Sequence, residues 1–351
     1  MLILGIETSC DETSAAVVEE TGNAARPWAI RSNVIASQVD IHREWGGVVP
    51  ELAARQHVRD ICGVVERAMT DASVTWADLG AIAVTQGPGL VGALLVGVSF
   101  AKAAAVAANL PVIGVHHLAG HIESVALHNG EMPLPAVILV VSGGHTSLYL
   151  VKEPGSYELL ARTRDDAAGE AYDKVAKMLG LGYPGGPVVD RLARQGNDVA
   201  IRWPGVRLTH ADRNAPELKG DLDFSFSGLK TAVLRHLTLR REQGTPLSEQ
   251  EIADICASFQ RAVVRALVER TFKAAAIYGA KSVGVAGGVS ANSRLRTDIK
   301  AYGDAREIPT FVPDLALSTD NAAMIAAAGL RRFRAGFTSP LDFNADPALA
   351  L

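Results

Sequence analysis

The sequence has few cysteines, few aromatic residues and no excess of positive charge. Its 351 residues include three cysteines, Cys10, Cys62 and Cys256, and no CxxC pair. Neither a disulfide framework nor a cysteine-ligated metal site is therefore expected. Lys and Arg number 34 and Asp and Glu 38, which gives a net charge of −4. This balance excludes a nucleic-acid binder that works by bulk positive charge, although a local basic face stays open.

Long uninterrupted apolar runs are also missing. The longest apolar stretch, from Leu90 to Leu110, is interrupted by Ser99 and Lys102. A membrane span needs about 20 predominantly apolar residues, so a buried helix is the better interpretation. The first residues have a short apolar run before Glu7 and no preceding positive region, so no signal peptide is predicted. We expect a reduced, soluble, cytoplasmic protein with no membrane contact.

Two stretches of the chain follow one pattern of apolar strand, small or polar turn, Thr-Ser and second apolar strand. They are GIETSCDETSAAVV and LVVSGGHTSLYLV, in which Thr13 matches Thr146 at an offset of 146 − 13 = 133 residues. We predict a duplicated α/β unit, with two similar domains facing each other across a cleft. The domains are expected at 1–132 and 133–333, with a tail at 334–351. Chance repetition within an α/β chain is the alternative.

Helical periodicity predicts helices at 50–71, 90–108, 117–128, 227–239, 248–278 and 318–332. A stretch from Gly196 to Asp223 has no clear period and is expected to be a long loop or insertion. Arginines gather around this stretch at Arg191, Arg194, Arg202, Arg207 and Arg213. They predict either a basic rim or a solvated loop of mixed charge.

Two histidines stand four residues apart on a predicted helix. His117 and His121 would project from one face, a spacing that suits one transition metal. The alternative is two histidines of the surface or the core. Leu118 stands where the zincin motif H-E-x-x-H has its glutamate, so a metalloprotease base is missing. Asp320, at the start of the last predicted helix, is a candidate third ligand, with N-capping as the alternative.

Glycine turns offer places for an anion or a nucleotide. Ser142-Gly143-Gly144 lies between two predicted strands, where backbone N–H groups can approach a phosphate, although an ordinary hairpin turn fits as well. Gly287-Gly288 follows a strand and opens a helix, which is a typical nucleotide location.

Polar residues near these turns are candidate nucleotide contacts. Asn292 is placed to bond a sugar or a base, with a surface helix position as the alternative. Asp190, which follows Pro184-Gly185-Gly186-Pro187, is placed to hold ribose hydroxyls. Asp166, Glu170 and Asp173 are expected to share a helix face that surrounds a ligand or is simply solvated.

Gly87, Gly89 and Gly92 formally match the dinucleotide fingerprint. They do not open the first βαβ unit, and no acidic residue ends the next strand. Close packing of a helix on a strand is the better interpretation of these glycines.

Taken in order, the motifs resemble one family. They are ETSCDET, GGVVPELA, GPGLVGALLVG, HHLAGH, VSGGHT, DDAAGEAYDK, YPGGP, DFSFSGLK, AGGVSAN and STDNAAMIA. Together they are similar to the bacterial type of the tRNA N6-adenosine threonylcarbamoyltransferase family, once described as glycoprotein endopeptidases. The resemblance covers about Leu2 to Arg332. It implies an actin–hexokinase–Hsp70 type fold with two duplicated RNase H-like domains.

The resemblance also implies an activity and a set of site residues. The family transfers a threonylcarbamoyl group from threonylcarbamoyl-AMP to N6 of the adenosine 3′ of the anticodon, in tRNAs that read ANN codons. The residues that match its metal ligands, for Fe²⁺ or alternatively Zn²⁺, are His117, His121 and Asp320. The residues that match its adenylate site are Val140, Val141, Ser142, Gly143, Gly144, Asp173, Gly186, Asp190 and Asn292.

The turn of the first domain that matches the glycine turn contains Asp11 and Glu12. These two residues are candidates to orient the attacking amine or to accept its proton. An Asx-turn is the alternative for Asp11. The family further implies an inactive paralogous subunit and a small P-loop ATPase as partners. The rival functions are a small-molecule kinase of the same fold and a non-catalytic scaffolding paralogue.

Overall fold

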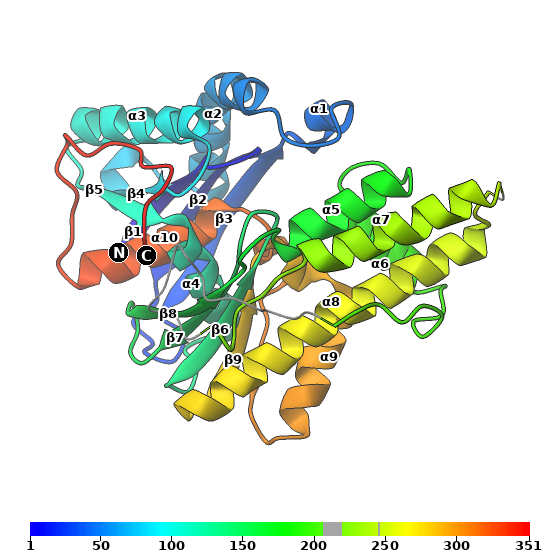
Figure 1. Ribbon diagram of the computed structural model, residues 1–351. Coiled ribbons are helices and arrows are strands. Elements are labelled where there is room, and N and C mark those ends of the chain that lie inside the picture. Colours follow the sequence, from blue (N-terminus) through cyan, green and yellow to red (C-terminus); the bar gives the residue numbers. More distant parts are fainter. Residues whose placement is uncertain (206–219, 245) are drawn as a thin grey trace. The chain divides into compact units, whose positions relative to one another are not determined.

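The computed structural model describes residues 1–205, 220–244 and 246–351. The chain divides into two compact units (Figure 1). Unit 1 comprises Met1–Met132, Glu153–Tyr157 and Pro313–Leu351, and unit 2 comprises Pro133–Lys152 and Glu158–Val312.

Unit 1 is built on a five-stranded mixed sheet with the order β3-β2-β1-β4-β5. Its strands are β1 (Leu2–Glu7), β2 (Glu12–Glu20), β3 (Trp28–Ser37), β4 (Leu79–Gly87) and β5 (Val112–His116). Strands β1, β2 and β3 are antiparallel neighbours, and β4 and β5 continue the sheet parallel to β1. The helices are α1 (Val39–Arg43), α2 (Pro50–Ala72), η1 (Trp76–Asp78), α3 (Val91–Ala108), α4 (His117–Asn129), η3 (Leu315–Leu317) and α10 (Ala322–Arg334).

Alternation along the strands of unit 1 places apolar side chains on both faces of the sheet. Ile3 and Ala16 pack on one face against the alanine-rich helix α10 and on Leu127 of α4. Leu4 and Ile6 pack on the other face against α2 and α3. A sheet with helices on both faces is the expected three-layer arrangement.

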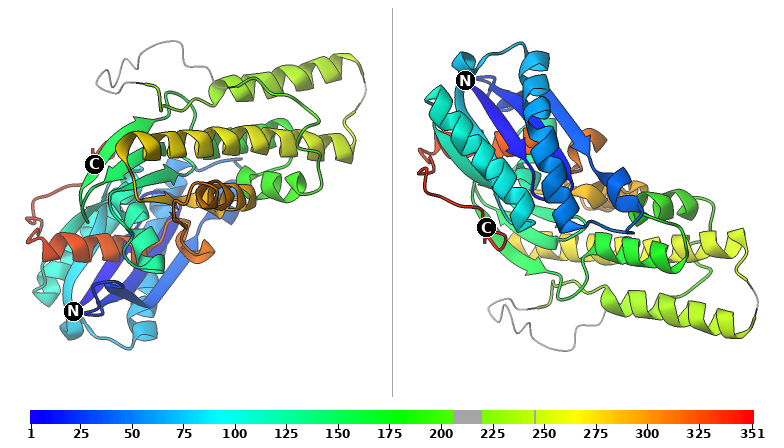
Figure 2. Two further views of the ribbon diagram at one scale, coloured as in Figure 1. Left: turned by 90° about the horizontal axis from the view of Figure 1, so that it is seen from below. Right: turned by 90° about the horizontal axis from the view of Figure 1, so that it is seen from above.

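Unit 2 repeats the same topology. Its sheet order is β10-β9-β6-β7-β8. Read from β8, the third strand of the unit comes first and is followed by the second, first, fourth and fifth strands, which is the order found in unit 1. The strands are β6 (Ala136–Val141), β7 (Thr146–Val151), β8 (Tyr157–Arg162), β9 (Ser282–Ala286) and β10 (Thr310–Phe311). The helices are α5 (Ala168–Met178), α6 (Gly185–Ala193), α7 (Ser227–Glu242), α8 (Glu249–Tyr278), η2 (Gly288–Ala291) and α9 (Ser293–Asp304), and Figure 2 shows α8 as the longest of them.

The predicted duplication is confirmed down to the register of the first hairpin. In unit 1, Glu7 pairs with Ser14, and in unit 2, Val140 pairs with Ser147. The offsets 140 − 7 and 147 − 14 are both 133 residues. Glu7 therefore stands where the second copy has a valine.

Several predicted boundaries differ from the structure. The last helix begins at Ala322 and not at Ser318, and it belongs to unit 1 and not to the second domain as predicted. The reason is that the alanines of α10 pack on β1 and β2. Strand β8, a short half-exposed segment, was not predicted.

The fingerprint glycines lie at close contacts, but these are made with the tail, the turn after β1 and helix α2, and not between a helix and a strand as predicted. A Cβ on Gly87 would lie 1.8 Å from the Asp346 carbonyl oxygen, and one on Gly89 would lie 2.6 Å from the Ser9 carbonyl oxygen. The tail after α10, shown in red beside the cyan helix α3 in Figures 1 and 2, occupies this space. Its contact with α3 is a hydrogen bond from Lys102 Nζ to the Phe343 carbonyl at 2.8 Å.

Candidate metal centre and glycine turn

The two histidines lie one turn apart at the start of α4. His116, the N-cap, accepts a hydrogen bond from the Leu118 backbone N–H through its own side chain, and the helix begins at His117. The next turn carries His121, and the two imidazoles meet edge to face with centroids 4.7 Å apart. Both side chains are buried, as is almost every residue of this helix.

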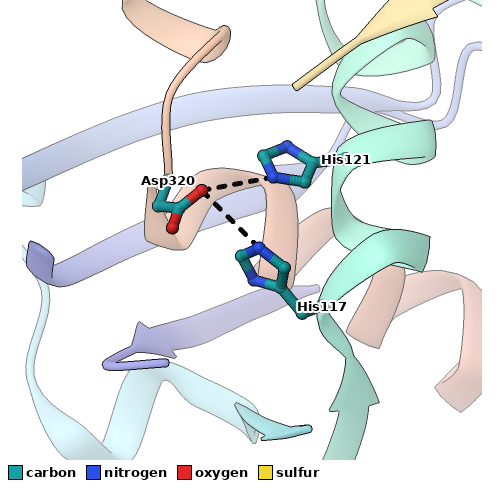
Figure 3. Close-up of side chains that lie close together, drawn as sticks. All are labelled: His117, His121 and Asp320. Carbon is teal, nitrogen blue, oxygen red and sulfur yellow. Dashed lines mark ion pairs between the residues drawn. The ribbon is translucent and has the colours of Figure 1, made fainter. Parts of the chain in front are cut away.

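Asp320 reaches the histidines from the segment before α10 (Figure 3). Its Oδ1 lies 3.2 Å from His121 Nε2 and 3.6 Å from His117 Nε2. The N-cap of α10 is Asn321, whose side chain accepts a hydrogen bond from the Met324 N–H. The capping alternative for Asp320 is therefore wrong, because the neighbouring residue fills that role.

These three side chains fit a metal ion. Their ligand atoms all lie within 4.8 Å of one another, and two ligands about 2.0–2.1 Å from a tetrahedral ion are roughly 3.3 Å apart. Nδ1 of His121 has no hydrogen-bond partner among the described residues, although the ring is fully buried, and Nε2 faces the Asp320 carboxylate oxygen at 3.2 Å. Two imidazole nitrogens that face one carboxylate oxygen are the arrangement expected of three ligands around a cation.

A carboxylate holds the other side of His117. Glu7 Oε2 lies 3.0 Å from His117 Nδ1, and Ser9 Oγ lies 3.2 Å from the same nitrogen. Burial lowers the pKa of His117, but Asp320 and Glu7 raise it, and the result is a pKa of about 9. Burial lowers the pKa of His121 below its ordinary value. Sequence reasoning missed Glu7, because a glutamate at the end of a strand looks like the edge of a turn.

Asp11 lies in the turn that leads into β2, and Glu12 is the first residue of that strand. Asp11 is buried, and Glu12 accepts a hydrogen bond from the Ser37 hydroxyl at 3.3 Å. Burial, followed by the negative charges of Asp320 and Asp11, raises the pKa of Glu12 well above its usual range. Glu12 therefore belongs to the electrostatic surroundings of Asp320.

The glycine turn of unit 2 is open where a ligand would need space. Val140 and Val141 are fully buried in β6, and the chain then turns at Ser142, Gly143 and Gly144. A Cβ added to either glycine would meet nothing within 4 Å. The start of α5 packs against the turn, where the Gly169 N–H donates to the Ser142 carbonyl at 3.2 Å.

The other predicted adenylate residues have partners within unit 2. Asp173 accepts a hydrogen bond from the Gly185 N–H at the start of α6 at 2.7 Å, and Gly186 follows in open space. Asp190 accepts from the Ser293 hydroxyl at 2.7 Å. Asn292 is the N-cap of α9, and its amide donates to Gln260 at 2.8 Å. These residues thus join α5, α6, α8 and α9.

The predicted acidic face is not an open cluster of carboxylates. Asp166 lies before α5, and Lys174 pairs with it at 2.8 Å and with Glu170 at 2.7 Å. Of the arginines around the insertion, Arg194 pairs with Asp190 at 3.0 Å. Arg207 and Arg213 lie outside the described residues, as does half of the predicted insertion.

One helix of the described chain, α3 (Val91–Ala108), is long and apolar enough to cross a membrane by length and composition. The core helix of a protein in water can pass the same test. In this structure α3 packs on α2 and β4.

The strand order that both units share defines the fold class of the protein. Full-length HypF, solved in a phosphate- and nucleotide-bound form, aligns over 95% of this chain and 46% of its own, with a TM-score of 0.58 and 13% identity. This likeness shows the fold alone, an α/β fold of the actin–hexokinase–Hsp70 kind, as predicted.

The family follows from the sequence comparisons. A sequence model described as tRNA N6-adenosine threonylcarbamoyltransferase matches residues 29–327. The protein of that name from Anaeromyxobacter dehalogenans is 51% identical over 350 residues, 99% of both chains. The one from Bacillus subtilis is 50% identical over 354 residues, covering 100% of this chain and 96% of its own. The chain belongs to the tRNA N6-adenosine threonylcarbamoyltransferase family, and the predicted membership is confirmed.

Proposed function

We propose that the protein transfers a threonylcarbamoyl group from threonylcarbamoyl-AMP to N6 of the adenosine 3′ of the anticodon, in tRNAs that read ANN codons, and releases AMP. The observation that carries the proposal is the meeting of His117, His121 and Asp320 in a chain of this family. Fold alone would not assign a reaction.

The ion is proposed to be Fe²⁺, with Zn²⁺ as the alternative. Two imidazoles and one carboxylate suit either metal. Three protein ligands leave coordination positions open for a substrate, as in catalytic sites. Asp320 keeps 19% of its side chain exposed, which is consistent with an approach from solvent on its side of the site. When bound, the ion would supply Lewis-acid polarisation and an anchor for the donor.

The remaining residues have roles in binding and proton handling. The turn Ser142–Gly144, with Val140 and Val141 behind it, is assigned to the adenylate phosphate through backbone N–H groups. Asp173, Gly186, Asp190 and Asn292 are assigned to its nucleoside.

Asp11 or Glu12 is assigned to the incoming amine, which needs orientation because an exocyclic amine is a weak nucleophile. Burial and its acidic neighbours raise the pKa of Glu12, which favours uptake of a proton by this carboxylate.

The proposed partners are tRNA, an inactive paralogous subunit and a small P-loop ATPase, all in the cytoplasm.

One assay tests the function against its rivals. The protein is incubated with its partners, threonylcarbamoyl-AMP and unmodified tRNA, and the tRNA nucleosides are then separated and identified. We expect threonylcarbamoyladenosine and one AMP for each group transferred. A matched tRNA with guanosine in place of the target adenosine should stay unmodified. Phosphoryl transfer from ATP to a small molecule would instead indicate a kinase, and no product with intact metal binding would indicate a scaffold.

A further inference from the structure

Glu7 is a charged side chain with no exposure to solvent. It ends β1, and its relative exposure is 0%. An isolated carboxylate in such surroundings is very costly unless it is paired and hydrogen-bonded. A glutamate that persists here therefore needs partners that repay its desolvation.

Each of its oxygens has such a partner. Oε1 accepts a hydrogen bond from the Ser9 backbone N–H, and Oε2 accepts one from the Thr85 hydroxyl at 2.8 Å. Oε2 also lies 3.0 Å from His117 Nδ1. The carboxylate is thus fixed by β4 and by the following turn, and it points at the ring nitrogen of His117 that faces away from Asp320.

The internal repeat shows that the fold does not require this charge. The register-equivalent residue in unit 2 is Val140, also fully buried. The same strand position is therefore filled by an apolar side chain in one copy and by a carboxylate in the other. The copy with the carboxylate is the one whose unit holds the two histidines and Asp320.

We propose that Glu7 is a positioning residue of the metal centre. It accepts the Nδ1 proton of His117, which fixes the ring so that Nε2 is the metal ligand, and it supplies a second negative charge beside the dication. Metal-bound histidines commonly have a carboxylate at the other ring nitrogen. His121 has no such partner among the described residues, so the orientation of the pair depends on His117. The inference rests on the proposed metal site.

Thr85 supports the carboxylate in turn. Thr85 is fully buried and its hydroxyl is bonded to the oxygen that faces His117. Thr85→Val keeps the shape of the side chain and removes that one donor. Its effect on metal binding should have the same direction as that of Glu7→Gln and be smaller.

The test measures metal affinity directly, with Zn²⁺ as the probe and a chelating dye as competitor. We expect Glu7→Gln to weaken Zn²⁺ binding by about 10- to 100-fold, and Thr85→Val by a smaller factor. Bound Co²⁺ should show a changed visible spectrum in Glu7→Gln, because the orientation of a ligand has changed.

The matched control is Thr8→Val, the next residue along the chain. The Thr8 hydroxyl is also buried, but it donates to the Ala93 carbonyl at 2.9 Å and not to the metal centre. This variant should lose stability without losing metal affinity.

The outcomes separate the two proposals. Wild-type protein that binds no metal would refute the metal site itself. Wild-type protein that binds Zn²⁺, with Glu7→Gln binding it equally well, would refute the role of Glu7 alone. If Glu7→Gln does not fold, Thr85→Val decides, and an affinity equal to that of Thr8→Val would overturn the inference.

Discussion

His121 is the residue whose surroundings make least sense without a metal ion. The Nδ1 of its buried ring has no hydrogen-bond partner among the residues with described positions, and its Nε2 lies 3.2 Å from a carboxylate oxygen of Asp320. We expect His117→Ala, His121→Ala and Asp320→Asn each to lower bound metal to less than about a tenth of the wild-type content, since two remaining ligands hold an ion poorly. Elemental analysis of the purified variants measures this.

His128→Ala is the control for the metal ligands. His128 lies at the other end of the same helix, on the surface. It should keep the wild-type metal content, and an equal loss in this variant would indicate general damage to α4 in place of loss of a ligand.

The pH dependence of metal binding follows from the protonation of His117. Its pKa is about 9, because the carboxylates of Asp320 and Glu7 outweigh the effect of burial. Below pH 9 the metal-free ring carries a proton, and an incoming ion has to displace it. Zn²⁺ affinity should therefore rise about tenfold for each pH unit between 6 and 8 and level off above 9.

Chelator competition, corrected for protonation of the chelator itself, measures this slope. Calorimetry in buffers of different ionisation enthalpy should show about one proton released for each ion bound. An affinity that stays constant across this range would contradict the protonation state assigned to His117.

The candidate site was predictable only in part from the residues themselves. The spacing of His117 and His121 indicates one helix face, because helical periodicity is local. Asp320 lies about two hundred positions further along, and the packing of α10 on α4, β1 and β2 brings it near. The repeat at an offset of 133 residues already aligns Glu7 with Val140, but burial of Glu7 and its contact with His117 appear only in the folded chain.

At the scale of elements, the approach of α10 to β1 places Asp320. A Cβ on Gly5 would lie 2.3 Å from the Ala322 carbonyl oxygen and 2.8 Å from the Ala326 nitrogen. Backbone atoms cannot move aside as the end of a side chain can. Gly5→Ala should lower the free energy of unfolding by about 1–3 kcal/mol or more and weaken metal binding, because the start of α10 is displaced.

Gly63→Ala in α2 is the matched control, measured by the same denaturant unfolding. Its Cβ would meet nothing within 4 Å, so replacing a helical glycine should raise stability by roughly 0.5–1 kcal/mol. Opposite signs for the two variants are the expected result. Equal effects would show that the contact between α10 and β1 is softer than the distances indicate.

At the scale of the whole molecule, the duplication could be predicted from the sequence, but the unit to which the last helix belongs could not. Strand, turn and strand recur in order, so the duplication is visible along the chain. Membership of α10 depends on which sheet its alanines cover, and a helix with apolar residues on much of its surface does not specify this. The tail after α10 has no helical or strand periodicity in its sequence. Its contacts are made largely through backbone groups, which leave no pattern in the side chains.

That tail is a structural part of unit 1. The Ser339 N–H donates to the Val112 carbonyl at 2.8 Å, and the Asp346 N–H donates to the Gln86 carbonyl at 2.9 Å. The Gly114 N–H donates to the Ser339 hydroxyl, and the Leu349 carbonyl lies 3.0 Å from His116 Nε2. The tail therefore joins the ends of β4 and β5 to the residue that caps the histidine helix.

Removing residues 339–351 should expose these groups. At about 1 kcal/mol for each hydrogen bond lost, we expect the free energy of unfolding to fall by about 2–4 kcal/mol, and the Gly114 amide to lose its protection from hydrogen exchange. Removing only Ala350 and Leu351 leaves every bond named above and should change neither quantity. Gly87→Ala offers a second route to the same state, since its Cβ would occupy the position of the Asp346 carbonyl. Unchanged exchange at Gly114 in both the long truncation and Gly87→Ala would show that the tail covers unit 1 without stabilising it.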